Sequence, residues 1–505
     1  MRRFGRADVR LGSLGIVGVS AAFVLLVGGC PDALTLGTSD GMSSSSSGAG
    51  ASGGGGGGTG GESAGCVSNS DCAAPKAVCD VAKGTCVECL EANDCAFRPG
   101  TICSLGECSC PTAGESYCGS PSRCVDLQAS GQDCGTCGHA CFGACAAGKC
   151  ADAWEPTQIK GAPSARSHHV AVWTSAKMIV WSGNTGAENT NTGGMLDTAT
   201  NTWTPTSTSN VPGPRQRARA VWTGTYMVVW GGANGAGATP LNTGGVFNPM
   251  SNTWITMSTL GAPSPRYGHT MVWTGTKVLV WGGFDGSNHL GDGAEYDVAQ
   301  DAWTPIASNG TPPSARKDHS ATWSGNAMIV FGGYGFDAMM GANTYLGDGA
   351  EYDPATGTWT TVKDGQPPAR ALHTAEWTTT MEMILWGGRD QLGLSPSGAR
   401  YKPTIEWTLM TTDGAPELRE YHTAVWMMPR LIVWGGLNAA GAYINSGGLY
   451  NPSTNSWSPK GIPTAPTGRA YHTAVNASPK MIIWGGVTAD GLTNTGGILD
   501  PSALP

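Results

Sequence analysis

The side chains best suited to chemistry are arginines and histidines that recur through the C-terminal two-thirds of this 505-residue chain. In each pair the Arg stands three residues before the His: Arg166 and His169, Arg266 and His269, Arg316 and His319, Arg370 and His373, Arg419 and His422, and Arg469 and His472. One further copy has Arg215 but carries Ala218 in place of the His.

Two interpretations of this series compete. A ring of imidazoles is able to ligate a metal ion. Alternatively, each Arg and His hydrogen-bonds loop carbonyls and braces neighbouring units. Repetition in every copy favours the brace, because a catalytic or metal site needs unlike groups that converge once. We therefore expect a structural role for these residues, no catalytic residue, no metal and no cofactor.

The pairs belong to a repeat whose core is an apolar run that ends in Trp-Gly-Gly or a close copy. Its copies occupy residues 178–183, 227–232, 278–283, 328–333, 383–388, 431–436 and 481–486. Their aromatic residues, the first being Trp181 and the last Trp484, follow one another at intervals of 48 to 55 residues. A repeat of this length, built from short strands, predicts an all-β propeller with four-stranded blades.

The third copy illustrates the four strands. They are predicted near residues 270–273, 278–281, 294–297 and 303–305. The continuous apolar run at 278–281 is typical of a strand buried on both faces. Gly282 and Gly283 end it, because glycine enters positive φ at low cost.

The late tryptophans of the repeat predict how the ring closes. They are Trp154, Trp203, Trp254, Trp303, Trp359, Trp407 and Trp457. The first precedes every apolar core, whereas the last core is followed by no such Trp. A strand near Trp154 is therefore expected to complete the final blade. The result is a closed ring of seven blades without exposed sheet edges.

Residues 154–500 resemble the kelch family in the Arg-x-x-His start, the apolar run to Gly-Gly, the Tyr-Asp-Pro-like strand and the late Trp. Departures include Ser182 for a Gly, Phe331 for a Trp, and Asn476 for a first-strand Trp. The resemblance implies a propeller that binds a partner, or else an enzyme such as the copper radical oxidases and sialic-acid mutarotases of secreted kelch-like type. The oxidases need a Cys crosslinked to Tyr, and residues 151–505 contain no Cys.

The N-terminus predicts export and lipid anchoring. Arginines precede a mostly apolar stretch, and residues 1–29 end in small residues directly before Cys30, as in a signal peptide. The segment resembles the bacterial lipobox, which implies that Cys30 is lipidated and attaches the protein to a membrane of the cell envelope. The alternative is an uncleaved membrane helix. Residues 30–65 are rich in Gly and Ser and predict a disordered tether.

The remaining cysteines, 16 of the 17, fall between Cys66 and Cys150. An even number in a short exported segment predicts a disulfide-rich region at 66–150, with sub-blocks 66–110 and 118–150. The second sub-block resembles the stigma-specific cysteine-rich family in its Cys-Gly-x-Cys-Gly-x-x-Cys run from Cys134. Zinc at Cys86-x-x-Cys89 and Cys134-x-x-Cys137 is the alternative.

Function is expected where the repeat varies. The net charge of −8 with 13% charged residues gives no support for nucleic-acid binding. The longest loop follows the fourth core and carries Tyr334, Phe336, Asp337, Met339, Met340 and Tyr345. These residues predict a recognition surface, with plugging of the central channel as the alternative. A calcium site at 285–288 lacks the full ligand pattern.

The sequence as a whole therefore favours an exported, surface-anchored, non-enzymatic binding module for a glycan, peptide or envelope partner. A mutarotase-like carbohydrate enzyme and a purely structural envelope protein are the alternatives.

Overall fold

The computed structural model describes residues 153–504 except 363–364, 404, 459–461 and 463–465, together with Gln128 and short strands between residues 78 and 150. All of them belong to one compact unit, Gly65–Pro505. In these residues the regular structure consists of β-strands and one 3-10 helix, η3 (Pro501–Ala503). No helix in this part is long and apolar enough to cross a membrane. The prediction of an all-β protein is confirmed.

The repeated element is an antiparallel sheet of four strands. In the third repeat these are β20 (Thr270–Trp273), β21 (Lys277–Trp281), β22 (Gly293–Asp297) and β23 (Ala302–Pro305), hydrogen-bonded in chain order. They match the four predicted strands of this copy. All residues of the apolar run in β21 are buried, as the unbroken apolar pattern requires.

The described residues of 153–504 contain seven such sheets, and the one built on β27 has a fifth, parallel strand, β24. Six of these sheets remain besides that of the third repeat. The sheet of the first repeat consists of β10 (Val170–Trp173), β11 (Lys177–Trp181), β12 (Gly193–Asp197) and β13 (Thr202–Pro205). The sheet of the second repeat consists of β14 (Arg219–Trp222), β15 (Met227–Trp230), β18 (Gly244–Asn248) and β19 (Thr253–Thr256). The next two are β26 (Ser320–Trp323), β27 (Met328–Phe331), β30 (Gly349–Asp353), β31 (Thr358–Thr361) with β24 (Asn309–Gly310), and β32 (Thr374–Trp377), β33 (Met383–Trp386), β36 (Gly398–Tyr401), β37 (Trp407–Leu409). The last two are β38 (Thr423–Met427), β39 (Arg430–Trp434), β40 (Gly447–Asn451), β41 (Ser456–Trp457), and β42 (Thr473–Ala477), β43 (Lys480–Trp484), β46 (Gly496–Leu499), β9 (Trp154–Pro156).

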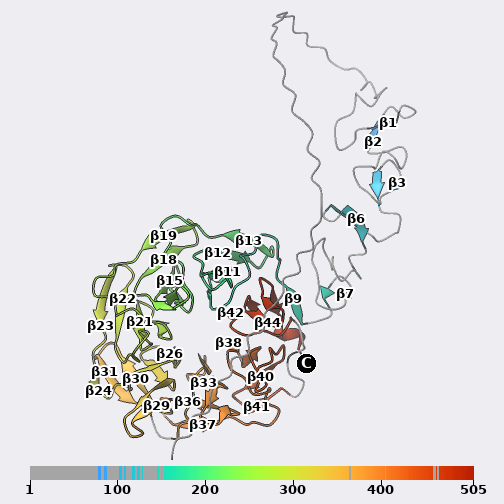
Figure 1. Cartoon of the computed structure of the whole chain (residues 1–505). Helices are drawn as coiled ribbons and strands as arrows, with labels where there is room; N and C mark the ends of the chain where they lie inside the picture. Colours follow the sequence, from blue (N-terminus) through green and yellow to red (C-terminus); the bar gives the residue numbers. More distant parts are fainter. Residues whose placement is uncertain are drawn as a thin grey trace, which may run out of the picture. The chain divides into compact units, whose positions relative to one another are not determined.

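The first strands of successive sheets are neighbours around a common axis (Figure 1). Each contacts the first strand of the next sheet, from β10 through β14, β20, β26, β32 and β38 to β42, and β42 in turn contacts β10. The last sheet is completed by β9, which pairs antiparallel with β46 and sets Trp154 opposite Leu499. The predicted pairing of the Trp154 strand with the last repeat is therefore present.

Tryptophan pairs join neighbouring sheets. The aromatic residue at the end of each second strand, Phe331 in the fourth repeat and Trp in the others, packs on the late Trp of the following repeat, as Trp281 does on Trp359 with ring centroids 5.4 Å apart. The same contact joins Trp434 of the sixth repeat to Trp154, at 5.4 Å. Trp484 of the seventh repeat packs on Trp203 of the first, at 5.5 Å. The hydrophobic core therefore lies between sheets and runs without interruption from the last repeat into the first.

A second set of short strands lies at the Gly-Gly end of the sheets. The hairpins are β16 (Ala233–Asn234) with β17 (Thr239–Pro240), β28 (Tyr334–Asp337) with β29 (Ala342–Tyr345), β34 (Arg389–Asp390) with β35 (Gly393–Leu394), and β44 (Val487–Thr488) with β45 (Gly491–Leu492). The segment 334–345 is thus a hairpin, and β25 (Arg316–Lys317) pairs with its first strand.

The described residues of the cysteine-rich segment form four backbone hairpins. They are β1 (Val78–Asp80) with β2 (Thr85–Val87), β3 (Ile102–Ser104) with β4 (Glu107–Ser109), β5 (Ser116–Gly119) with β6 (Ser122–Val125), and β7 (Cys145–Ala146) with β8 (Lys149–Cys150). The predicted signal peptide, Cys30 and the tether at 30–65 lie outside the described residues.

Candidate functional site

The seven repeated arginines are fully buried and bind carbonyls within their own repeat. The Arg166 guanidinium donates to the carbonyl oxygens of Ser164, Ser182 and Thr192 at 2.9, 3.0 and 2.7 Å. Its own carbonyl accepts from the N–H of Gly486 in the preceding repeat at 2.8 Å. Burial lowers the pKa of Arg166 to about 10, so it remains a cation at neutral pH. Each Arg thus ties the loops of its repeat together while its backbone reaches the neighbour.

The repeated histidines are buried and neutral. Burial, followed by the charge of Arg166, lowers the pKa of His169 to about 3. In five repeats the Nε2 atom shares a hydrogen bond with a hydroxyl of the preceding repeat. The pairs are His169 with Thr473, His319 with Thr270, His373 with Ser320, His422 with Thr374, and His472 with Thr423, at 2.8 to 2.9 Å. No group of three or more His, Cys, Asp or Glu in the described residues is arranged to hold a metal ion.

The second repeat breaks this series. Ala218 takes the place of the His, and the residue that would face it in the first repeat is Val170 in place of Thr or Ser. In the next repeat His269 has no hydroxyl partner, because Arg219 occupies the Thr position. The Nε atom of Arg219 donates instead to the carbonyl oxygen of His269 at 2.9 Å.

A variable ring lies directly beside the repeated histidines. The residue before each His position has positive φ in all repeats, between 53° and 68°. The seven residues are His168, Arg217, Gly268, Asp318, Leu372, Tyr421 and Tyr471. Such a conformation costs a non-Gly residue roughly 1 kcal/mol or more. The same backbone shape thus carries side chains of very different chemistry.

Backbone hydrogen bonds between neighbouring repeats explain the positive φ of the variable ring. The N–H of Arg217 donates to the carbonyl of His168 at 3.0 Å, and the N–H of His168 donates to the carbonyl of Tyr471 at 3.3 Å. The same bond links Asp318 to Gly268 at 2.9 Å. A left-handed residue points its N–H and carbonyl along the circle, which leaves its side chain free to face the axis.

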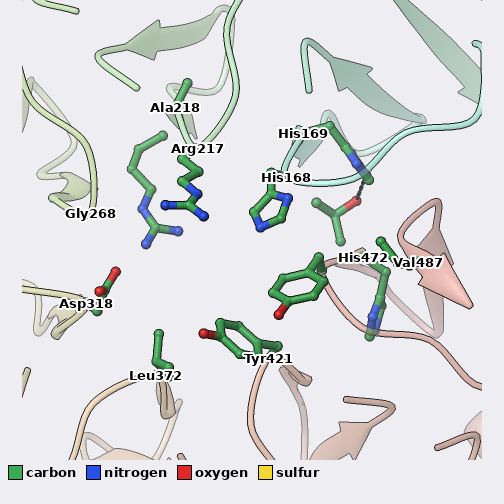
Figure 2. A pocket seen from close by; sticks show the side chains of 13 residues that line it. His168, His169, Arg217, Ala218, Gly268, Asp318, Leu372, Tyr421, His472 and Val487 are labelled. Carbon is green, nitrogen blue, oxygen red and sulfur yellow. Dashed lines mark hydrogen bonds between the residues drawn. The ribbon is translucent and has the colours of Figure 1, made fainter. Parts of the chain in front are cut away.

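The variable ring surrounds an axial cavity of about 450 Å³. Figure 2 shows His168, Arg217, Asp318, Leu372 and Tyr421 arranged around this opening, with their side chains directed into it. Segments on both sides of each Gly-Gly strand meet at this end, since the residue after the repeated Arg pairs with the loop after the Gly-Gly, as at Tyr267 and Phe284. The cavity is therefore a recess at the centre of the loop end of the sheets.

Charge is concentrated on one side of the cavity. Arg217 and Arg219 come from the second repeat and Asp318 from the fourth. Burial raises the pKa of Asp318, while Lys317 and the two arginines act in the opposite direction. Burial, and then Arg217, lowers the pKa of His168 to about 4, so its imidazole is neutral. Within the part of the chain that the structure describes, neither arginine forms an ion pair with a carboxylate.

Aromatic rings form the other side. The rings of His168 and Tyr471 stack with centroids 4.5 Å apart, and those of Tyr421 and Tyr471 lie 4.4 Å apart. Burial raises the pKa of both phenols, so their hydroxyls stay protonated at neutral pH. The cavity thus combines cations, one carboxylate, phenolic hydroxyls and aromatic surface, a composition suited to a small polar ligand.

An inner cavity of about 350 Å³ continues along the axis. Arg219 lines both cavities and thus lies at their junction. Hydroxyl-bearing residues and alanines make up most of the wall, and Glu376 is its carboxyl group. Burial raises the pKa of Glu376 to about 7, against a small opposing effect of a backbone hydrogen bond from Trp426.

The residues 334–345, predicted as a recognition surface, lie away from the axial cavities. Phe336, Met339 and Met340 are 51%, 99% and 68% exposed and line neither cavity, so they do not plug the channel. Tyr334 and Tyr345 pack against each other across the hairpin, with centroids 5.4 Å apart.

The tip of this hairpin is held by Asp337. Its carboxylate accepts from the N–H groups of Met339 and Met340 at 2.8 and 3.1 Å. The neighbouring turn adds Leu392, which is 99% exposed, and the two turns are joined by a hydrogen bond from Gln391 to Thr344. The hairpin is therefore an ordered apolar projection at the loop end of the sheets.

Four-stranded sheets arranged around an axis, with repeated Gly-Gly ends, are consistent with a β-propeller of kelch type. Residues 150–261 and 218–397 match the KLHDC2/KLHL20/DRC7 Kelch-repeats domain, which supports this class. Kelch-repeat domains typically mediate protein interactions. No curated protein matches the chain.

The variable ring was not among the residues predicted from the sequence to bind a partner. The signal was present, because this position lies between a repeated Arg and a repeated His and yet differs in nearly every copy. The positive φ, which makes the side chains converge, has no signature in the sequence apart from Gly268.

Proposed function

We propose that the chain is an exported kelch-repeat protein, anchored to the cell envelope by lipid, which acts as a non-enzymatic binding module for a glycan, peptide or envelope partner. The observation that carries the proposal is the variable ring around the axial cavity. A position held in one backbone conformation but occupied by different side chains is suited to recognition, because the scaffold fixes the geometry and the side chains set the specificity.

We further propose a ring of seven blades closed by β9. The pairing of β9 with β46 and the packing of Trp154 on Trp434 support it. In this arrangement no first or last sheet is left with an open edge, which suits a protein that works outside the cell. The repeated Arg and His residues then brace adjacent blades, as their buried hydrogen bonds suggest.

Export is supported by the sequence of residues 1–29 and by the cysteine-rich region at 66–150. In that region the backbone register sets Cys79 opposite Cys86, Cys103 opposite Cys108, and Cys145 opposite Cys150. Directly opposite positions of an antiparallel pair share one face of the sheet. The register is therefore compatible with cross-strand disulfides, which form in oxidising compartments.

The anchoring proposal is tested by Cys30→Ser. Without the thiol no lipid can be attached, so the variant is expected in the soluble fraction of fractionated cells, while the natural chain sediments with membranes. Cys66→Ser serves as the matched control and should still sediment. Sedimentation of the Cys30→Ser variant would contradict lipid anchoring.

The binding proposal is tested with the full chain on a panel of glycans, peptides and purified envelope components. A ring variant, Arg217→Ala with Tyr421→Ala, should lose the partner, because it removes a cation and an aromatic wall of the axial cavity. A hairpin variant, Phe336→Ser with Met339→Ser, measures how much the exposed hairpin contributes. Leu260→Ser, at an 86% exposed position outside the cavity, is the control. Full binding by the ring variant would refute the axial site.

A further inference from the structure

The axial cavity carries unbalanced positive charge, although the whole chain has a net charge of −8. Arg217 and Arg219 contribute two guanidinium groups, and Asp318 contributes the one carboxyl group of the cavity wall. Arg217 lies over the ring of Tyr267 at 5.7 Å, and Arg219 makes one hydrogen bond, to a backbone carbonyl. Both guanidinium groups therefore keep donors for a ligand.

The geometry of the two arginines suits a carboxylate. A guanidinium group offers a planar set of donors that matches a carboxylate better than an ammonium group does. Arg217 projects at the level of the variable ring, while Arg219 lies deeper, at the junction with the inner cavity. Both arginine side chains remain exposed to water within the cavity, so their attraction to an anion is screened by salt.

The rest of the cavity wall offers partners for hydroxyl groups. Asp318 accepts hydrogen bonds but repels a carboxylate, so it favours a ligand that carries hydroxyl donors next to its acid group. The stacked rings of His168, Tyr471 and Tyr421 present aromatic surface and two phenolic hydroxyls. Aromatic edges carry partial positive charge, which also suits electron-rich oxygen atoms.

We infer that the axial cavity binds a carboxylated sugar residue, with its carboxylate on Arg217 and Arg219 and its hydroxyls on Asp318 and Tyr421. This inference rests on the proposed binding function and names its ligand class. A cavity of about 450 Å³ accommodates one or two sugar rings. A neutral sugar would leave the two guanidinium groups unpaired, which costs binding energy.

The test is calorimetric titration of the full chain with galacturonate and glucuronate, and with the dimer of galacturonate. Glucose and galactose are the uncharged controls, and a short peptide with a free C-terminal carboxylate tests whether a carboxylate suffices. The acidic sugars are expected to bind, with an affinity that falls as salt rises. Glucose and galactose should bind at least tenfold more weakly.

Two variants locate the site. Arg217→Gln and Arg219→Gln are each expected to weaken binding of galacturonate by about 10- to 100-fold, since each removes a charge-assisted hydrogen bond. Arg430→Gln, at the first residue of β39 and at the end of that strand away from the cavity, is the matched control and should bind as the natural chain does. Tyr421→Phe, which keeps the ring and removes one donor, is a milder variant that should still fold and should weaken binding by a smaller factor.

Several outcomes would overturn the inference. These are no binding of either acidic sugar, equal binding of glucose, or unchanged binding in both arginine variants. Binding of the peptide but not of the sugars would also overturn the ligand class. The proposed binding function would survive that result if the peptide is lost in the Arg217→Ala, Tyr421→Ala variant, so the two failures are distinguishable.

Discussion

Two residues, Ser182 of the first repeat and Ala218 of the second, depart from the pattern together. In the other repeats the first Gly of the Gly-Gly pair lies against the imidazole of the next repeat. At Gly485, with φ of +68°, an added Cβ would be 2.6 Å from Cε1 of His169. The first repeat has Ser182 at this position, and the residue that would crowd it is Ala218. Loss of the imidazole thus makes room for a side chain.

This compensation predicts different effects for equivalent substitutions. Gly485→Ser should lower the free energy of unfolding by roughly 1–3 kcal/mol, through positive φ and overlap with His169. Ser182→Gly should change it by less than about 1 kcal/mol, because the first repeat has no imidazole at this contact. Chemical denaturation of both variants checks the pair. Equal destabilisation would show that the contact with the imidazole is not what selects glycine.

The half-buried carboxyl group of Glu376 gives a pH-dependent prediction. Burial raises the pKa of Glu376 to about 7 from its ordinary value of 4.5. Between these values the folded chain holds a proton that the unfolded chain has lost, so Glu376 makes the protein less stable as pH rises from about 4.5 to 7. Arg219, His319, His373 and His422 line the same cavity.

Glu376→Gln is expected to remove this part of the pH dependence and to stabilise the protein at pH 7 more than at pH 4.5. Thermal unfolding at several pH values measures it. Glu406→Gln, an exposed site, controls for the loss of one negative charge. An unchanged slope in the Glu376 variant would mean that its carboxyl group titrates in its ordinary range.

At this scale the sequence predicted the repeated residues better than the residues that line the axial cavity. The spacing of Arg166 and His169 recurs, so the series was visible without a structure. Asp318 and Tyr421 are residues of different types. They have in common a backbone conformation of positive φ, which is set by hydrogen bonds between repeats. Such bonds depend on the packing of distant segments, and a periodic pattern does not encode which side chains they bring together.

Among the elements, the hairpin β28–β29 is expected to contribute little to the stability of the fold. Its apolar tip is exposed, and Phe336 and Met339 belong to none of the buried clusters between sheets. Replacing residues 338–341 with Asn-Gly, a favourable two-residue turn, should therefore shift the melting temperature by no more than about 2 °C. Differential scanning calorimetry checks it, with Val330→Ala in the buried strand β27 as a destabilising comparison. A large loss of stability would show that the tip packs on the rest of the protein.

The strands of the sheets themselves were predictable, because the second strand of each sheet, such as β21, is an unbroken apolar run that ends at glycine. The hairpins at the loop end were not. The segment 334–345 contains polar, glycine and aromatic residues without clear periodicity. Its first strand pairs with β25, which begins at the repeated Arg316. That pairing is a tertiary contact, which local propensity does not predict.

At the scale of the whole ring, the two ends of the repeat array meet in one sheet. The strand β9 supplies Trp154, which is fully buried against Trp434, and its backbone pairs with β46. The N–H of Asp500 also donates to the carbonyl of Ala153 at 2.8 Å. Residues more than 300 positions apart in the sequence are thereby held in contact.

Removing the closing strand should therefore affect every sheet and not only the last. Deletion of residues 151–158 exposes the edge of β46 and the Trp434 face, so we expect a lower melting temperature, a broader transition and concentration-dependent association through the open edge. Trp154→Ala is the milder form and should cost about 3–5 kcal/mol, as for other large buried aromatic residues. Ile159→Ala, at an exposed position directly after the deleted segment, is the control. Scanning calorimetry combined with light scattering measures both effects. An unchanged melting transition in the deletion variant would mean that the sheets are stable as an open array and that closure by β9 contributes nothing to the fold.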